Sequence, residues 1–168
     1  MNLNSQNTEP HVFIDIDGCL ATTRQYYSNK KHWHPTFECY RFDEKCVRVF
    51  NEITDEINPV LILSSDWKYH YRLEQINEIF EWNGVHSRIS DFTQSSWGVE
   101  FKSFQQLEEC RAYEILQYVI NHNVQNYVAI DDLDLKQWIP DNFVCCPRAN
   151  EGIKQLGIKE KILEILTQ

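Results

Sequence analysis

The chain has 168 residues, 16 of them basic and 25 acidic, so its formal net charge at pH 7 is −9. The acidic balance argues against binding nucleic acid through a general basic surface, and an apolar content of 42% excludes wholesale disorder. No apolar run approaches the roughly 20 residues that span a bilayer. We expect a single domain over residues 11–168, preceded by a polar, disordered lead-in over residues 1–10.

Strand patterns and helix patterns alternate along the chain. Apolar, β-branched runs predict strands at residues 11–17, 59–65, 85–90, 126–132 and 143–146. Apolar residues at helical spacing predict helices over residues 43–57, 68–82, 110–123 and 151–166. The stretch 91–108 shows neither pattern and is expected to form a loop. This alternation is typical of a three-layer α/β fold with a mostly parallel, Rossmann-like sheet.

Three of the predicted strands turn polar abruptly where they end. The paired polar residues at these ends are Asp15 and Asp17, Ser64 and Ser65, and Asp131 and Asp132. Ligands of parallel sheets bind at the carboxyl ends of the strands, so we expect one acidic cluster with a hydroxyl beside it. Such a cluster repels itself unless a hard cation neutralises it, and carboxylates suit Mg²⁺.

A phosphate substrate would also require a basic side chain near these acids. Arg111 is well placed, because it lies at the start of the predicted helix that leads into the strand ending on Asp131. Lys68, which follows Ser64 closely, is the alternative.

Four short stretches in this order resemble the motifs of the haloacid dehalogenase (HAD) phosphatase superfamily. They are DIDGCL, LILSS, the arginine at position 111 and VAIDD. Two longer stretches, CVRVFNEITDEINPVLILSSDWK and RAYEILQYVINHNVQNYVAIDD, are similar to the HAD domains associated with Swiss Army Knife RNA repair proteins. The resemblance covers about residues 11–146 and implies a HAD-like fold.

The resemblance implies a Mg²⁺-dependent phosphohydrolase that cleaves a phosphomonoester. Asp15 would be the nucleophile that forms an aspartyl-phosphate, and Asp17 would be the general acid and then the general base. Ser64 would hydrogen-bond a phosphoryl oxygen, and Arg111 would offset the charge of the intermediate.

The metal and substrate contacts implied by the resemblance involve further residues. The implied Mg²⁺ ligands are Asp15, Asp17, Asp131 and Asp132, with Asp132 favoured over Asp131 as the direct ligand. Gly18 would let the chain turn sharply beneath the phosphate. Ser65 and Lys68 are further candidates for binding the substrate.

Residues 19–42 lie where the superfamily places a cap over the active site, and they are aromatic and basic. Lys30, Lys31, His32 and His34 are candidates for meeting a phosphate, while Tyr26, Tyr27 and Trp33 are candidates for stacking on a ring. The alternative is a solvated loop whose aromatic side chains pack onto the domain. A cap this small leaves the site open, which suits a phosphoprotein or a nucleic-acid end.

Other interpretations of these residues are weaker. A calcium loop starting at the DIDG motif fails, because Cys19 and Leu20 occupy positions where oxygen ligands belong. The six cysteines form no CxxC pair, which predicts reduced thiols in a cytoplasmic protein and leaves export as an effector open. The rival function is a catalytically inactive HAD-like module that binds a partner.

Overall fold

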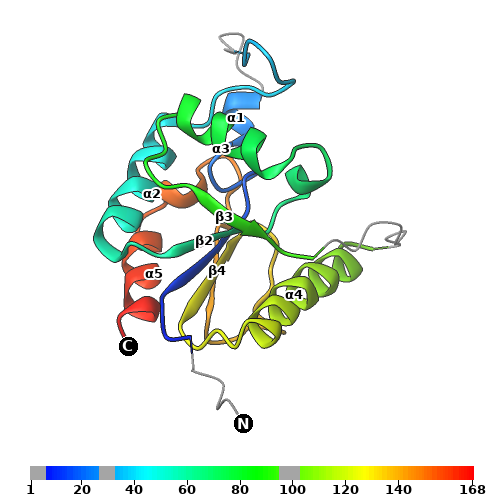
Figure 1. Ribbon diagram of the computed structural model, residues 1–168, viewed down its shortest axis with the longest axis vertical. Helices are drawn as coiled ribbons and strands as arrows, with labels where there is room; N and C mark the ends of the chain where they lie inside the picture. Colours follow the sequence, from blue (N-terminus) through cyan, green and yellow to red (C-terminus); the bar gives the residue numbers. More distant parts are fainter. Residues whose placement is uncertain (1–6, 27–32, 95–102) are drawn as a thin grey trace.

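The structure is a computed structural model that describes residues 7–26, 33–94 and 103–168. Within these residues the chain forms a five-stranded parallel sheet in the order β3-β2-β1-β4-β5 (Figure 1). The strands are β1 (His11–Ile14), β2 (Val60–Leu63), β3 (Ile89–Phe92), β4 (Tyr127–Asp131) and β5 (Phe143–Cys145). This arrangement confirms the predicted α/β, Rossmann-like fold class.

Helices cover both faces of this sheet. They are α1 (Thr23–Tyr26), α2 (Glu44–Ile57), α3 (Leu73–Trp82), α4 (Phe104–Asn121) and α5 (Ile158–Leu166), with 3₁₀ helices at Asp66–Tyr69 and Gly152–Lys154. In Figure 1, α4 lies on one side of the sheet, and α2 and α5 lie on the other. The fold is therefore a three-layer arrangement.

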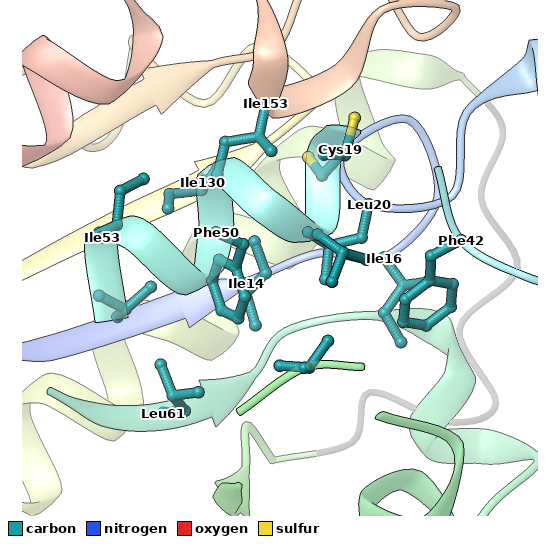
Figure 2. Packing of buried hydrophobic residues seen from close by; sticks show 14 of the residues in the cluster. Ile14, Ile16, Cys19, Leu20, Phe42, Phe50, Ile53, Leu61, Ile130 and Ile153 are labelled. Atoms are coloured by element: carbon teal, nitrogen blue, oxygen red, sulfur yellow. The ribbon is translucent and has the colours of Figure 1, made fainter. Parts of the chain in front are cut away.

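The alternation of side chains along β1 explains why both faces are covered. Val12 and Ile14 point to the face that carries α2, α3 and α5, whereas Phe13 points to the face that carries α4. Figure 2 shows Ile14 in one cluster with Phe50 and Ile53 of α2. All of these side chains are fully buried, so the sheet is held by apolar burial on both sides.

Several helix boundaries differ from the expected ones. The most important is that of α4, which begins at Phe104 inside the expected loop and not at residue 110. Ser103 provides the cap, because its hydroxyl accepts the N–H of Gln106 at 3.3 Å. The first two turns of this helix carry four polar residues, QQ and EE, so apolar spacing did not indicate its start.

Three other elements also begin at residues other than the predicted ones. The predicted helix 68–82 begins at Leu73, since the preceding residues form the 3₁₀ helix Asp66–Tyr69. The predicted helix 151–166 begins at Ile158, after Gly157 with its left-handed φ of 84°. The third strand, expected at 85–90, runs from Ile89 to Phe92, because Ile89 pairs with Leu61 of β2.

The expected lead-in and the expected cap fall only partly within the described residues. Residues 1–6 and 27–32 lie outside, and Asn7 is already hydrogen-bonded to the backbone of Asn123 and Gln125. Cys19 and Leu20, at the start of the expected cap, are fully buried in the core.

The remaining expectations concern the thiols and the membrane. All six cysteines are free thiols. In the described ranges, none of the helices combines the length and the apolar character needed to cross a bilayer.

Candidate active site

The carboxyl edge of the three central strands gathers the polar strand ends. The parallel register brings Asp15, which follows β1, level with Ser64 after β2 and with Asp131 at the end of β4. The N–H of Asp15 donates to the carbonyl of Ile130 at 3.0 Å, and that of Ser64 donates to Ile14 at 2.9 Å. Sheet pairing itself therefore holds these residues side by side.

Arg111 enters this edge from α4 and is enclosed by carboxylates. Its Nη1 donates to Oδ2 of Asp131 at 2.8 Å and to the backbone carbonyl of Ser64, and it lies 3.4 Å from Oδ1 of Asp15. Its Nη2 donates to Oδ1 of Asp66 at 2.8 Å. Arg111 is the eighth residue of α4 and not the first of its helix, so its side chain comes from a rigid, fully formed stretch of helix.

The buried carboxylates at this edge resist ionisation. Burial raises the pKa of Asp15 well above its ordinary value, and Asp131 raises it further, against the opposing effect of Arg111. Burial also raises the pKa of Asp131, although Arg111 lowers it. Burial and the neighbouring Asp131 raise the pKa of Asp132 to about 6. A bound cation would relieve this shared repulsion.

Three of these carboxylates are spaced closely enough to share a metal ion. One oxygen from each of Asp15, Asp131 and Asp132 lies within 4.8 Å of the others. An all-oxygen set of anionic ligands suits Mg²⁺, so the residues present fit this ion. Asp17, which the sequence also suggests as a ligand, is not part of the group.

The two acids at the end of β4 differ in how many of their oxygens are already engaged. Asp131 is 1% exposed, its Oδ1 accepts the N–H of Leu133 at 3.0 Å, and its Oδ2 accepts from Arg111. Asp132 is partly exposed and faces the recess described below. This difference favours Asp132 as the direct ligand and Asp131 as the residue that positions Arg111.

Gly18 allows the turn after β1 to pass close to Asp132. Its φ is +73°, and a Cβ at this position would overlap the carboxylate of Asp132. Its N–H donates to the carbonyl of Ala21 at 2.9 Å, which closes the turn. Glycine is therefore required here for two reasons, the left-handed backbone and the close approach.

We expect Gly18→Ala to displace Asp132, to lower the free energy of unfolding and to weaken Mg²⁺ binding. Gly84→Ala is the matched control, because Gly84 has a similar φ of +78° with no atom within 4 Å of the added Cβ. In Gly84→Ala the free energy of unfolding is expected to fall only by the roughly 1–2 kcal/mol that a left-handed backbone costs an alanine. Urea denaturation and the Mg²⁺-induced rise in Tm measure the two effects. Equal losses and equal Mg²⁺ responses in both variants would show that the contact with Asp132 is unimportant.

Asp17 lies at the outer side of the same edge. Its Oδ2 accepts a hydrogen bond from Nε1 of Trp67 at 2.8 Å. The side chain is exposed overall, but its carboxylate lies in a recess where loss of water raises its pKa; Asp66 adds to this, and Trp67 opposes it. A raised pKa increases the fraction of Asp17 that holds a proton at a given pH.

These residues surround a recess of about 140 Å³. It is lined by Asp15, Asp17, Ser65, Asp66, Leu107, Arg111, Asp132 and Leu133. Ser65, and not Ser64, is the serine on its wall. Among the described residues, the hydroxyl of Ser64 is buried without a hydrogen-bond partner, and that of Ser65 is buried beside Asp15, whose pKa it lowers. The Ser65 hydroxyl is therefore placed to stabilise the ionised form of Asp15.

Of the other expected basic residues, Lys68 and His34 are described by the structure, and neither lines the recess. The side chain of Lys68 is 2% exposed and donates to Oε2 of Glu114 at 2.5 Å and to the hydroxyl of Thr93 at 2.9 Å. Lys30 and Lys31 lie outside the described residues. His34 is buried, and its Nδ1 accepts two backbone N–H groups, so it supports the local turn.

Sequence patterns alone missed two residues that contact the acids and the arginine of this site. Asp66 contacts Arg111, and Trp67 contacts Asp17. Both directly follow the two serines at the end of β2, at the edge where ligands were expected. Their position in the stretch LSSDWK is the signal that could have identified them.

Comparison with known proteins identifies the family of this chain. A family model described as the HAD domain in Swiss Army Knife RNA repair proteins matches residues 11–155. The matched range contains all five strands and every residue that lines the recess. No curated protein and no solved structure matches the chain significantly.

Proposed function

The chain belongs to the family of HAD domains in Swiss Army Knife RNA repair proteins, and on this premise we propose that it is a Mg²⁺-dependent phosphohydrolase. The reaction is the cleavage of a phosphomonoester through an aspartyl-phosphate on Asp15. The observation that carries the proposal is the recess itself, where a candidate nucleophile, a candidate cation site and a guanidinium meet. Anion binding beside a carboxylate nucleophile requires this combination.

Asp15 and Asp17 divide the chemistry between them. A carboxylate oxygen of Asp15 attacks phosphorus, the bond from phosphorus to the leaving oxygen breaks, and Asp17 gives its proton to that oxygen. Asp17 then takes a proton from water, the resulting hydroxide oxygen bonds to phosphorus, and the bond from Asp15 to phosphorus breaks. The products are the alcohol and inorganic phosphate. The raised pKa of Asp17 supports its role as the acid of the first step.

The other residues bind and orient. Arg111 offsets the charge of the phosphoryl group and is positioned by Asp131, while Asp15 and Asp132 would hold the cation directly. When bound, Mg²⁺ supplies the positive charge that allows an anionic nucleophile to approach an anionic substrate.

Ser65→Ala is expected to lower kcat/KM about tenfold or more, because the hydroxyl beside Asp15 then no longer stabilises the ionised nucleophile. Ser64→Ala is the matched control, since Ser64 is equally buried but does not line the recess. Ser64→Ala is not expected to lower stability, because it removes a buried polar atom without a partner. Steady-state kinetics on both variants decides the matter, and a larger loss in Ser64→Ala would reassign this role to that serine.

The substrate is a phosphate carried by a macromolecule. A small cap suits such a substrate, and the two classes in question are a phosphoprotein and a nucleic-acid end, the latter suggested by the name of the family. The net charge of −9 favours the phosphoprotein.

Removal of the metal tests the proposed reaction. The protein is expected to release inorganic phosphate from an aryl phosphate in the presence of Mg²⁺, to stop when EDTA is added, and to recover with excess Mg²⁺. Phosphate release is measured directly, and binding of Mg²⁺ is followed by the shift in Tm. A Mg²⁺-dependent rise in Tm without phosphate release from any of a broad panel of substrates would instead support the inactive binding module.

A further inference from the structure

A second and larger cleft lies beside the recess. Its volume is about 660 Å³, within the range of ligand pockets. Asp17 and Asp66 line both the cleft and the recess. If the recess holds the phosphoryl group, the group attached to it can extend past Asp17 and Asp66 into this cleft.

Rings form the wall of the cleft. Trp67 contacts Tyr71 with ring centroids 5.5 Å apart, and Tyr71 contacts Phe37 at 5.8 Å. Tyr40 and His70 also line it. The contacts of Phe37 and Trp67 with Tyr71 fix these rings against one another, so the wall is prepared for stacking.

The aromatic wall begins at the residue that would protonate the leaving group. Nε1 of Trp67 is 2.8 Å from Oδ2 of Asp17. A ring that reaches this wall from the leaving oxygen must therefore be bonded close to that oxygen. The ring of a phenol is attached directly to the oxygen, whereas a nucleobase is separated from it by a sugar.

The charge of the cleft also favours a phenol ring in a peptide over a nucleic-acid strand. Its described lining includes the carboxylates of Asp17, Glu38 and Asp66 and no Lys or Arg. The phosphodiesters of a nucleic-acid strand would be repelled there, whereas basic residues beside the phosphate would be attracted.

We propose that this cleft binds the phenol ring of a phosphotyrosine residue in a peptide segment with basic neighbours. This inference rests on the proposed phosphohydrolase function and names its substrate class. The phosphoryl group lies in the recess, the tyrosyl ring packs on Trp67 and Tyr71, and flanking Lys or Arg side chains meet Glu38.

The first experiment tests the ring. The ratio of kcat/KM for a phosphotyrosine peptide to that for the matched phosphoserine peptide is measured for the wild type, Tyr71→Leu and Tyr71→Phe. A phenyl phosphate is intrinsically more reactive than an alkyl phosphate, but this difference is the same for every variant. It therefore cancels when the ratio is compared between the variants and the wild type. Tyr71→Leu is expected to lower the ratio about three- to tenfold, and Tyr71→Phe, which keeps the ring, is expected to retain it.

The second experiment tests the charge and does not depend on packing. Glu38 is exposed, so Glu38→Lys is expected to fold normally and to shift preference from Lys-flanked to Glu-flanked phosphotyrosine peptides by about fivefold or more. Glu78→Lys is the control, because Glu78 is exposed on α3 outside the cleft. The control is expected to leave the preference unchanged.

The possible outcomes distinguish failure of the phosphotyrosine inference from failure of the proposed phosphohydrolase function. The inference is overturned, and the phosphohydrolase function is kept, if Tyr71→Leu leaves the ratio of phosphotyrosine to phosphoserine hydrolysis unchanged. The same holds if Glu38→Lys and Glu78→Lys show the same preference between Lys-flanked and Glu-flanked peptides. Faster turnover of 3′- or 5′-phosphorylated oligonucleotides than of the peptides overturns it in favour of nucleic-acid ends. Absence of hydrolysis on every substrate instead rejects the proposed function itself.

Discussion

Replacing Asp15 with asparagine is expected to lower phosphate release by at least about a thousandfold while the protein remains folded. The amide cannot act as the nucleophile, and removing the nucleophile of a covalent mechanism costs on the order of 10³–10⁶ in kcat. Hydrolysis of an aryl phosphate in saturating Mg²⁺ measures the loss. Turnover of Asp15→Asn near that of the wild type would refute the assignment of Asp15.

The same substitution is expected not to lower Tm. Burial raises the pKa of Asp15 in the folded protein, so its ionisation costs stability as the pH rises through that pKa. Asparagine does not ionise, and at neutral pH without Mg²⁺ we expect Asp15→Asn to be at least as stable as the wild type. Below the ordinary pKa of an aspartate this difference should disappear. A large fall in Tm at neutral pH would mean that the activity loss reflects unfolding.

The second large effect is expected for Arg111→Met, which should lower the free energy of unfolding by about 3–5 kcal/mol. This cost arises because Asp131 is 1% exposed and loses its cationic partner, while Asp15 loses a nearby positive charge. Burial lowers the pKa of Arg111 by itself, but the surrounding carboxylates outweigh burial and raise it, so the guanidinium remains charged. Urea denaturation in EDTA measures the loss.

Two further measurements test whether unpaired carboxylates cause the loss of stability in Arg111→Met. Mg²⁺ is expected to reduce the loss in Arg111→Met, since a cation at the cluster replaces part of the missing charge. The double variant Arg111→Met with Asp131→Asn is expected to be more stable than Arg111→Met alone, because no unpaired charge remains at position 131. A loss below about 1 kcal/mol in the single variant would show that water, and not Arg111, satisfies these carboxylates.

Much of the site could be predicted because it depends on local patterns. The apolar runs before Asp15, Ser64 and Asp131 indicated strands, and parallel pairing brings the ends of such strands to one edge. The side chain of Arg111 reaches this edge although its helix begins at Phe104, six residues before the predicted start at residue 110. The error in the boundary did not change which face of the sheet the helix covers.

The sequence by itself determined the order of the elements, the α/β class and the acidic, hydroxyl-bearing edge, because apolar periodicity and abrupt polarity at strand ends are properties of neighbouring residues. Only the tertiary structure decided that Ser65 and Asp66 line the recess, that Trp67 contacts Asp17, and that the side chain of Lys68 is buried against Glu114. These features depend on the direction of single side chains after the strand ends. They are set by packing between segments that are distant in the sequence, such as β2 and α4, and no local pattern records that packing.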